Sequence, residues 1–223
     1  MSEKRNLYII GAGDFGRVME YWLDLIPESE RDWRLAGFLH SYEGKSPLED
    51  YPTSLSIAGD WQDFGFRDSD LCIMGISNPS WKRRVHERLK DKVEFMTFIH
   101  PAASLNRRFL QIGAGAVICP HCVLSTNVRA GACVTICIGT QIGHDVVLGD
   151  YSSLMGNVEI GGHAKIGEGA YVGSNATIIP HKSICPGAYI GAGSVVVRNV
   201  KDTTTRFGNP ARPLSVREMG EMG

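Results

Sequence analysis

The stretch IGHDVVLGDYSSLMGNVEIGGHAKIGEGAYVG (142–173) repeats an aliphatic residue every six positions, and glycine often follows that residue. The same phase holds from Ile112 to Lys201, where the chain divides into fifteen consecutive hexads without an insertion. The first position is Ile, Leu or Val in fourteen hexads and Ala130 in the other, and glycine fills the second position in eight. A helix does not produce a six-residue period with so many glycines.

This period predicts a parallel β-helix. Each hexad makes one short flat wall with its aliphatic side chain inward, and we expect the second-position glycine to permit the sharp corner between walls. Three hexads close one triangular turn, so fifteen hexads predict about five coils of eighteen residues. The hand of the coil does not follow from the pattern, since the general rule for parallel crossovers favours right-handed connections.

The front of the chain follows a different pattern, in which short apolar runs alternate with helix-like segments. The order is strand, helix, strand, loop, strand, helix and strand, in the segments 7–10, 14–26, 33–39, 40–54, 71–76, 79–91 and 93–99. This order predicts a small parallel α/β domain of Rossmann-like type. We therefore expect an α/β domain at 1–104, a β-helix at 105–214 and a C-terminal tail at 215–223.

Composition and charge narrow the classes of partner. The chain has 223 residues, of which 43% are hydrophobic, as expected of a folded globular protein. Lys and Arg number 23 against 24 Asp and Glu, so the chain lacks the basic surplus that nucleic acid or an anionic membrane would attract. The apolar run near the N-terminus is too short for the hydrophobic region of a signal peptide, and no segment approaches the roughly 18 apolar residues of a membrane span. We expect a cytoplasmic protein that binds no nucleic acid and inserts in no membrane.

The six cysteines include a Cys-x2-Cys at 119 and 122 and a Cys-x3-Cys at 133 and 137, which invites a zinc interpretation. The repeat argues against it. Cys119 and Cys137 are second positions one turn apart, whereas Cys122 is a fifth position that points inward. Four ligands cannot converge from those directions, so we interpret the cysteines as small core or corner thiols and expect no metal.

Several motifs, taken with the hexad pattern, carry a resemblance to a known family. They are IIGAGDFGRV (9–18), GFL (37–39), IHPAA (99–103), IGHD (142–145) and GNPARPL (208–214). Together they resemble the hexapeptide-repeat sugar O- and N-acyltransferases of the sialic acid O-acetyltransferase group, which includes UDP-4-amino-sugar N-acetyltransferases. The resemblance implies a left-handed β-helix, a homotrimer, acetyl-CoA between neighbouring coils and a nucleotide-sugar in the front domain. The implied reaction is acetyl transfer from acetyl-CoA to an amine or hydroxyl of a sugar or nucleotide-sugar.

One outward column of side chains gives a local reason to expect an oligomer. Sixth positions of four hexads fall on the same wall of the triangle, at Val117, Thr135, Tyr171 and Tyr189. An exposed column with two tyrosines is expected to be covered by another copy of the chain.

His144 is the candidate general base, because an imidazole titrating near neutrality can take the proton of an amine or hydroxyl that attacks a thioester. Asp145 matches the acidic residue that follows this histidine in the family and would orient the ring. Neighbours in a straight strand point to opposite faces, so the pair meets only if a corner lies there. Counting hexads puts His163 and His181 on the same wall or corner, which predicts a ladder of imidazoles. The alternative is that His144 is an exposed corner residue without a role.

The resemblance also assigns residues to acetyl-CoA. Gly162 matches a glycine whose N–H is directed at the thioester carbonyl, and the alternative is an ordinary corner glycine. Ser153 stands where some members carry a second histidine, and Ala192 matches a glycine whose backbone touches the cofactor. Ser174 completes this set. A zinc site of the gamma-class carbonic anhydrase type does not fit the spacing of IGHDVVLGD.

The turn GAGDFG (11–16) follows a strand and precedes a helix, an arrangement that lets backbone approach a phosphate. Alone it suggests a dinucleotide, but His40 and Ser41 replace the acidic residue that would hold a ribose, so NAD is not expected. The resemblance instead assigns a nucleotide-sugar to Gly11, Gly13, Gly16, His40 and Ser41. Asp14 departs from the glycine of the family and would repel a phosphate if it pointed inward. The alternative is a tight turn without a ligand.

The sequence therefore favours an acetyl-CoA-dependent sugar acetyltransferase without a covalent acyl-enzyme. Since Ser153, Asp14 and His40 depart from the family pattern, a second hypothesis stays open: a trimer that binds a nucleotide-sugar or acts as a scaffold and has no catalytic activity.

Overall fold

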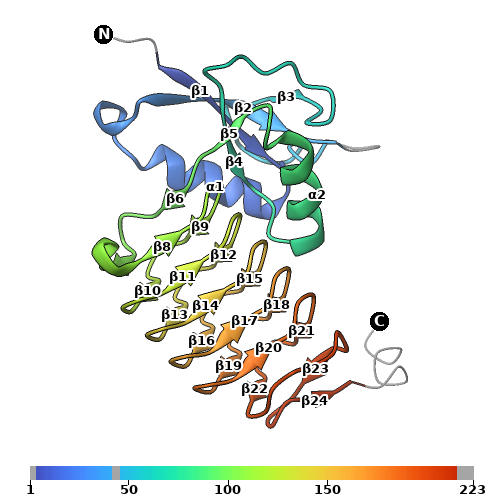
Figure 1. Ribbon diagram of the computed structural model, residues 1–223. Coiled ribbons are helices and arrows are strands. Elements are labelled where there is room, and N and C mark those ends of the chain that lie inside the picture. The colour runs from blue at the N-terminus through green and yellow to red at the C-terminus, as the bar shows by residue number, and fades with distance from the viewer. Residues whose placement is uncertain (1–3, 42–45, 215–223) are drawn as a thin grey trace. The chain divides into compact units, whose positions relative to one another are not determined.

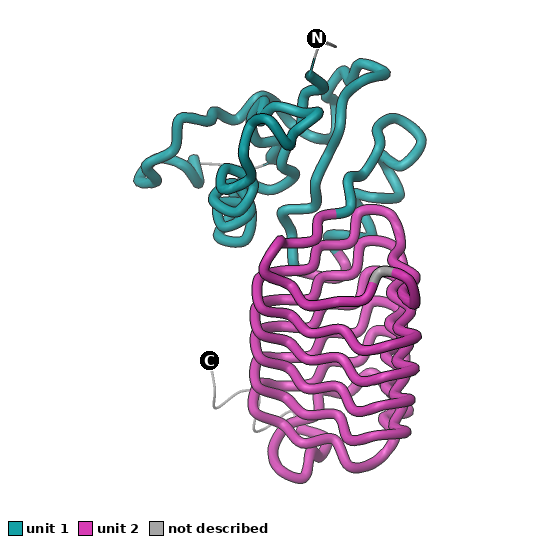
Figure 2. Tube along the Cα trace, turned by 90° about the vertical axis from the view of Figure 1, so that its left-hand side faces the viewer, with its two compact units in different colours: residues 1–77, 81–97 teal, residues 78–80, 98–223 magenta. Residues whose placement is uncertain are grey.

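The computed structural model describes residues 4–41 and 46–214, and the chain divides into two compact units. Unit 1 contains Met1–Ser77 and Trp81–Thr97, and unit 2 contains Asn78–Ser80 and Phe98–Gly223 (Figure 2). The main division thus falls at Phe98, ahead of the boundary predicted after residue 104. The tail predicted at 215–223 lies outside the described residues. Within them, no helix has both the length and the apolar character to cross a membrane.

Unit 1 is a five-stranded parallel sheet in the order β3-β2-β1-β4-β5, with two main helices (Figure 1). Its elements are β1 (Arg5–Ile10), α1 (Asp14–Asp24), η1 (Glu28–Glu30), β2 (Trp33–Leu39), β3 (Ile57–Gly59), β4 (Leu71–Met74), α2 (Pro79–Leu89) and β5 (Glu94–Phe95). The predicted small parallel α/β fold is confirmed, and β3 is an additional short strand. The order reverses between β1 and β4, the switch point at which open parallel sheets bind ligands.

Unit 2 is a parallel β-helix with three walls (Figure 1). The first wall consists of β6 (Phe98–Ile99), β9 (Val117–Ile118), β12 (Thr135–Ile136), β15 (Ser153–Leu154), β18 (Tyr171–Val172), β21 (Tyr189–Ile190), β23 (Arg206–Phe207) and the antiparallel β24 (Arg212–Pro213). The second consists of β7 (Ser104–Leu105), β10 (Val123–Leu124), β13 (Gln141–Ile142), β16 (Glu159–Ile160), β19 (Thr177–Ile178) and β22 (Val195–Val196). The third consists of β8 (Gln111–Ile112), β11 (Arg129–Ala130), β14 (Val147–Leu148), β17 (Lys165–Ile166) and β20 (Ser183–Ile184).

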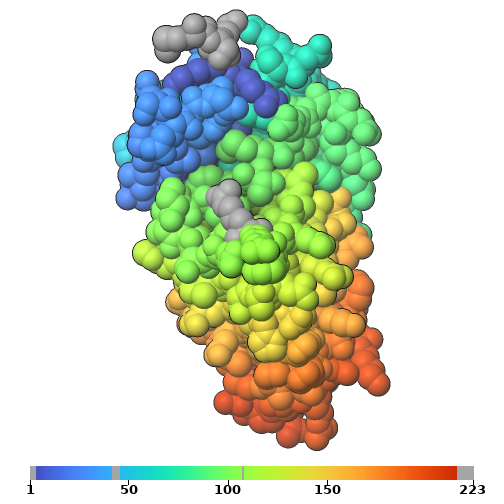
Figure 3. Space-filling view, turned by 60° about the vertical axis from the view of Figure 1, so that its left-hand side comes forward, coloured from blue at the N-terminus to red at the C-terminus, as the bar shows by residue number. Residues whose placement is uncertain are grey.

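The register confirms the hexad phase. Paired residues of β8 to β22 are eighteen positions apart, as with Gln141 and Glu159 on the second wall, and successive turns follow in chain order (Figure 3). The strands β8 to β22 correspond to the fifteen hexads, but the coil continues at both ends, with β6 and β7 before them and β23 after them. The coil is therefore longer than the five turns predicted. The short helix η2 (Arg107–Phe109) interrupts the phase ahead of β8 and hides the earlier strands from a hexad count. The left hand stays a prediction from the resemblance.

The inward aliphatics form the core of the coil. The first-wall residues Ile118, Ile136, Leu154, Val172 and Ile190 are fully buried, as expected of first positions. The column of sixth positions that we expected to point outward is only partly exposed. Two of its four residues, Val117 and Thr135, are fully buried within the chain.

The corners are made at the fourth position of the hexad. In each of the first fourteen hexads this residue has a positive φ. A β-carbon makes this conformation unfavourable, so it is found mainly in glycine, which has none, and in Asn, Asp and His, which tolerate it best. The occupants are Gly115, His121, Asn127, Cys133, Gly139, Asp145, Tyr151, Asn157, His163, Gly169, Asn175, His181, Gly187 and Gly193. The expectation that second-position glycines provide the corner conformation is therefore wrong, since none of those glycines has a positive φ.

Second-position glycines are required instead by the close approach of successive turns. A β-carbon on Gly149 would lie 2.4 Å from the backbone nitrogen of Glu168 in the next turn. The corresponding distance is 2.7 Å from Gly143 to Gly162 N and 2.3 Å from Gly167 to Pro186 N. Side chains at these positions would push the stacked turns apart.

Gly149→Ala should therefore destabilise the coil by roughly 1–3 kcal/mol, the usual range for an overpacked site. Gly156→Ala is the matched control, because its β-carbon would meet Ile138 Cγ2 at an ordinary 3.5 Å, and its effect should stay within about 0.5 kcal/mol. Chemical unfolding of both variants measures the difference. Equal losses of stability would contradict the steric explanation.

Candidate active site

His144 and Asp145 lie at the corner between the second and third walls, where β13 ends and β14 begins. Asp145 has a φ of 58°, so the backbone turns between the two residues and brings their side chains together. His144 Nδ1 and Asp145 Oδ2 are 2.8 Å apart. The condition for contact between His144 and Asp145, a corner at this point of the chain, is therefore met.

A second hydrogen bond keeps the Asp145 carboxylate ionised. The Asn127 side-chain amide, one turn earlier, donates to Asp145 Oδ1 at 2.6 Å. The pKa of Asp145 is lowered, first by this bond and then by the bond with His144. Since an ionised carboxylate only accepts, we assign the proton of the His144 contact to Nδ1, which leaves Nε2 as a proton acceptor. The His144 side chain is 54% exposed, so a reactant can reach Nε2.

Asn127 was not among the predicted site residues, although the repeat contains the signal. It occupies the same fourth position as Asp145, eighteen residues earlier, and stacked turns bring such positions into contact.

The imidazole ladder is present. The rings of His144 and His163 are 5.0 Å apart between centroids and nearly perpendicular, at 88°. The rings of His163 and His181 are 4.8 Å apart and almost parallel, at 8°. These spacings match the roughly 4.8 Å rise of stacked strands.

Gly162 leaves room for the His144 ring. A β-carbon at 162 would lie 2.7 Å from His144 Nε2, so any side chain there would displace the imidazole. The Gly162 carbonyl accepts from His181 N–H at 2.9 Å, while none of the hydrogen bonds between described residues uses the Gly162 N–H. The Gly162 N–H is therefore available as a backbone donor at the same corner.

His144, Asp145 and His163 form the one group of three ligand-type side chains that lie within 4.8 Å of one another in the described part of the chain. Two ligands of a tetrahedral zinc ion are about 3.3 Å apart, given bond lengths near 2.0 Å. The 2.8 Å contact between His144 and Asp145 is shorter and is a hydrogen bond. The buried Cys122 thiol donates to the Cys137 carbonyl at 3.1 Å, in keeping with a core thiol.

The residues assigned to acetyl-CoA lie on two different edges of the coil. Gly162 shares the corner of His144, between the second and third walls. Ser174 and Ala192 lie on successive turns of the corner between the first and second walls, where Gly193 N–H donates to the Ser174 carbonyl. Ser153 lies in β15 on the first wall and is fully buried. Within one chain, the second wall separates the two corners.

The glycine-rich turn of unit 1 contains two glycines required by packing and one that is open. Gly11 has a φ of 95°, and a β-carbon on Gly16 would lie 1.8 Å from the Gly11 carbonyl oxygen. Gly13 is exposed and begins α1 without a side-chain cap, and a β-carbon on it would meet nothing within 4 Å. Asp14 is 95% exposed and pairs with Arg17. Its carboxylate is thus turned to solvent and neutralised rather than directed inward.

His40 and Ser41 make contacts within unit 1. His40 Nδ1 accepts from the Ala12 N–H at 3.1 Å, and burial lowers the pKa of this imidazole. The Ser41 hydroxyl accepts from the Gln62 side-chain amide at 2.8 Å. His40 therefore supports the glycine-rich turn in its neutral form.

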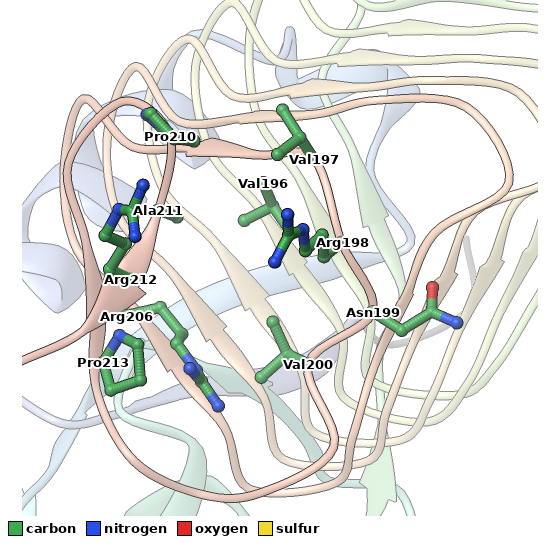
Figure 4. A pocket seen from close by; sticks show the side chains of 10 residues that line it. All are labelled: Val196, Val197, Arg198, Asn199, Val200, Arg206, Pro210, Ala211, Arg212 and Pro213. Atoms are coloured by element: carbon green, nitrogen blue, oxygen red, sulfur yellow. The ribbon is translucent and has the colours of Figure 1, made fainter.

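The GNPARPL motif helps to line a cavity of about 250 Å³ at the end of the coil (Figure 4). Three arginines surround it: Arg198, Arg206 and Arg212. Arg206 is paired with Asp202 at 2.7 Å.

These features define the class of protein: a parallel β-helix of hexapeptide repeats with a hydrogen-bonded His–Asp pair at one corner. The family described as bacterial transferase hexapeptide (six repeats) matches residues 139–179. No curated protein was found to match the chain by sequence.

Solved structures resemble the fold of nearly the whole chain. The acetyltransferase domain of PglB from Neisseria gonorrhoeae FA1090 has a TM-score of 0.82 at 22% identity, with 95% of this chain and 100% of that chain covered. PerB from Caulobacter crescentus, in complex with CoA and GDP-perosamine, has a TM-score of 0.80 at 21% identity, with 94% and 97% covered. WeeI from Acinetobacter baumannii AYE has a TM-score of 0.68 at 24% identity, with 95% and 100% covered. The chain therefore carries the hexapeptide repeat and shares its two-part fold with these proteins.

Replacing Asn127 by Ala should raise the pKa of Asp145 toward its ordinary value, because the ionised form loses its main hydrogen-bond donor. A depressed carboxyl pKa stabilises the fold at pH values above the unfolded-state pKa, and this contribution is lost as the pH falls through the folded pKa. The Asn127→Ala variant should therefore lose less stability on acidification. A carbon-13 titration of the aspartate carboxyls measures the pKa. Asn157→Ala, at a different corner, should leave it unchanged, and an unshifted pKa in Asn127→Ala would contradict the assignment.

Proposed function

We propose that this protein transfers an acetyl group from acetyl-CoA to an amine or hydroxyl of a sugar or nucleotide-sugar. The observation that carries the proposal is the His144–Asp145 pair, in which the His144 side chain is 54% exposed and its Nε2 faces the space that a side chain at Gly162 would fill. An oriented imidazole and a backbone N–H are the two groups that direct attack on a thioester requires.

In the proposed reaction, the acceptor nitrogen or oxygen attacks the thioester carbonyl carbon while His144 Nε2 takes its proton. The Gly162 N–H donates to the carbonyl oxygen as negative charge develops there. The carbon–sulfur bond then breaks, the imidazolium returns the proton to the departing thiolate, and free CoA and the acetylated sugar are released. Asp145 holds the ring and stabilises the imidazolium throughout.

The choice of donor and acceptor is supported by the proteins that share the fold. The PglB acetyltransferase domain has been solved in complex with acetyl coenzyme A. PerB was solved with CoA and GDP-perosamine, and histidine mutants of that perosamine N-acetyltransferase were solved with the same ligands. In this chain, the open Gly13 at the uncapped N-terminus of α1 would face the nucleotide-sugar diphosphate. The cytoplasmic location expected from the sequence is part of this proposal.

We further propose that the active form is a homotrimer whose site is shared between copies. The proposed cofactor residues lie on two corners, so acetyl-CoA can contact both only where a corner of one chain meets the other corner of its neighbour. Tyr171 and Tyr189 stack on the first wall at 4.6 Å, and Tyr189 remains 45% exposed, which leaves aromatic surface for a partner.

His144→Ala should lower the rate of thiol release from acetyl-CoA by roughly 10²–10⁴-fold, the usual contribution of a general base. The assay uses a panel of amino sugars, sialic acid and nucleotide-sugars. His121→Asn removes an imidazole from another corner and should retain the wild-type rate. If the wild-type protein binds a nucleotide-sugar but releases no thiol with any acceptor, the non-catalytic hypothesis is favoured.

The shared site predicts complementation between two inactive variants. His144→Ala lacks the base, and Ala192→Trp should block the opposite corner, so each should be inactive alone. When both chains are co-expressed and assemble at random, about a quarter of the wild-type rate should return, since some interfaces combine two intact corners. Failure to recover activity in mixed assemblies would argue for a site contained within one chain.

A further inference from the structure

The cavity at the end of the coil has a local excess of positive charge. Its lining residues include Arg198, Arg206 and Arg212 and contain neither aspartate nor glutamate. Arg206 and Arg212 come from the β23–β24 hairpin on one side of the cavity, and Arg198, which follows β22, lies on the other (Figure 4). The chain as a whole has a net charge of −1, so the excess belongs to the cavity and not to the protein in general.

Only part of this charge is neutralised within the chain. Asp202 pairs with Arg206 at 2.7 Å, and the other oxygen of Asp202 accepts hydrogen bonds from Thr204. In the part of the chain that the structure describes, no ion pair or side-chain hydrogen bond includes Arg198 or Arg212, and both residues are exposed. Since guanidinium groups keep their positive charge, two cations at this cavity are accessible to an anion.

The third guanidinium is mostly buried and has an unused donor. The Arg206 side chain is 15% exposed, and its Nη2 donates to Asp202. Its Nε is buried and has no hydrogen-bond partner among the described residues. A buried charged N–H without an acceptor costs free energy, and each such group in a native structure calls for an explanation. An anion in the cavity that Arg206 lines is a group that can supply the missing acceptor.

Backbone hydrogen bonds hold the segments that line the cavity. Val195 N–H donates to the Gly208 carbonyl at 3.0 Å, and Ala211 N–H donates to the Val195 carbonyl at 2.8 Å, which fixes the β23–β24 hairpin to β22. Val200 N–H donates to the Ser183 carbonyl at 2.8 Å, which fixes the segment after β22 to β20. The backbone positions of the three arginines are therefore set before a ligand binds.

The segment after β22 also offers backbone donors. Among the hydrogen bonds between described residues, none uses the N–H of Val197, Arg198 or Asn199. These three residues are exposed and line the cavity. Arginine side chains and backbone N–H groups are the donors with which proteins commonly bind phosphate.

The size and charge of the cavity favour one phosphate group of a ligand rather than a whole ligand. Its volume is about 250 Å³, whereas pockets that enclose a small molecule usually measure roughly 300–1,000 Å³. Arginine binds phosphate through paired N–H groups. A phosphate monoester carries close to two negative charges, which suits a site with several guanidinium groups better than a singly charged carboxylate does.

The cavity is separate from the His144 corner but lies on the same edge of the coil. Arg198 is the third residue of its hexad, as His144 is, and β22 lies three strands beyond β13 in the second wall. At about 4.8 Å per strand, the two positions are roughly 14 Å apart along the coil. A phosphate bound at the cavity therefore does not occupy the place of the reacting groups.

We propose that the cavity lined by Arg198, Arg206 and Arg212 is a binding site for a phosphate monoester group. Arg198 and Arg212 supply accessible positive charge, and Arg206 supplies a buried donor. The phosphate has two sources, the 3′-phosphate of CoA and free inorganic phosphate. The first source rests on the proposed function, in which CoA is the carrier of the acetyl group. Binding of phosphate itself does not depend on that function.

Isothermal titration calorimetry of the full chain with CoA, 3′-dephospho-CoA and inorganic phosphate tests the site. If CoA is the source, the wild type should bind CoA roughly tenfold or more tightly than 3′-dephospho-CoA, the size expected of a charge-assisted contact. Arg198→Gln and Arg212→Gln should each reduce this preference. Arg129→Gln is the matched control, because it makes the same change of charge at an exposed position on the third wall, and it should keep the preference.

Free phosphate as the source predicts a different pattern. CoA and 3′-dephospho-CoA should then bind equally, while inorganic phosphate should bind the wild type and Arg129→Gln and bind the two cavity variants more weakly. The proposal is overturned if neither the preference for CoA nor the binding of inorganic phosphate depends on Arg198 or Arg212. Both side chains are exposed, so the glutamine variants should fold, and circular dichroism checks that they do.

The binding measurements do not use turnover, so they separate this inference from the proposed function. If His144→Ala leaves turnover unchanged but the cavity variants lose phosphate binding, the proposed function fails and the inference stands. If His144→Ala abolishes turnover and the cavity variants bind every phosphate as the wild type does, only the inference fails.

Discussion

The close stacking of one corner directly on the next is the constraint on which unit 2 depends. Backbone atoms of successive turns approach so closely at the second position that a β-carbon on Gly149 would lie 2.4 Å from its neighbour. Two positions later the chain must adopt a positive φ to begin the next wall. Together these requirements fix the place of each residue within its turn, and the paired strands from β8 to β22 are accordingly eighteen residues apart.

The same constraint places polar and titratable side chains at the corner. Residues that tolerate a positive φ besides glycine are mainly Asn, Asp and His, which are also hydrogen-bonding or titratable groups. At the corner between the second and third walls, the fourth positions are Asn127, Asp145, His163 and His181. The fold thus stacks an amide, a carboxylate and two imidazoles in one column, and His144 joins it from the third position. A polar cluster here follows from backbone geometry, and the proposed reaction uses what that geometry provides.

The hexad phase was sufficient to predict the walls, the inward aliphatics and the imidazole ladder, because all of these depend only on counting residues. The contact between His144 and Asp145 followed once the fourth position proved to be the corner. Three features could not be read from the pattern. Glycine is required at the second position because of the short distance between successive turns. The strands before β8 precede the η2 helix, which breaks the six-residue phase. The supporting role of neutral His40 depends on its hydrogen bond from the Ala12 N–H. Each of these is set by contacts between segments far apart in the chain.

Each complete turn lengthens the coil by the same distance, one strand spacing. The distance from the His144 corner to the end of the hexad repeat is therefore set by the number of complete turns between them. Evolution could therefore adjust the reach of the protein in steps of about 4.8 Å, by gaining or losing complete turns, without redesigning either end.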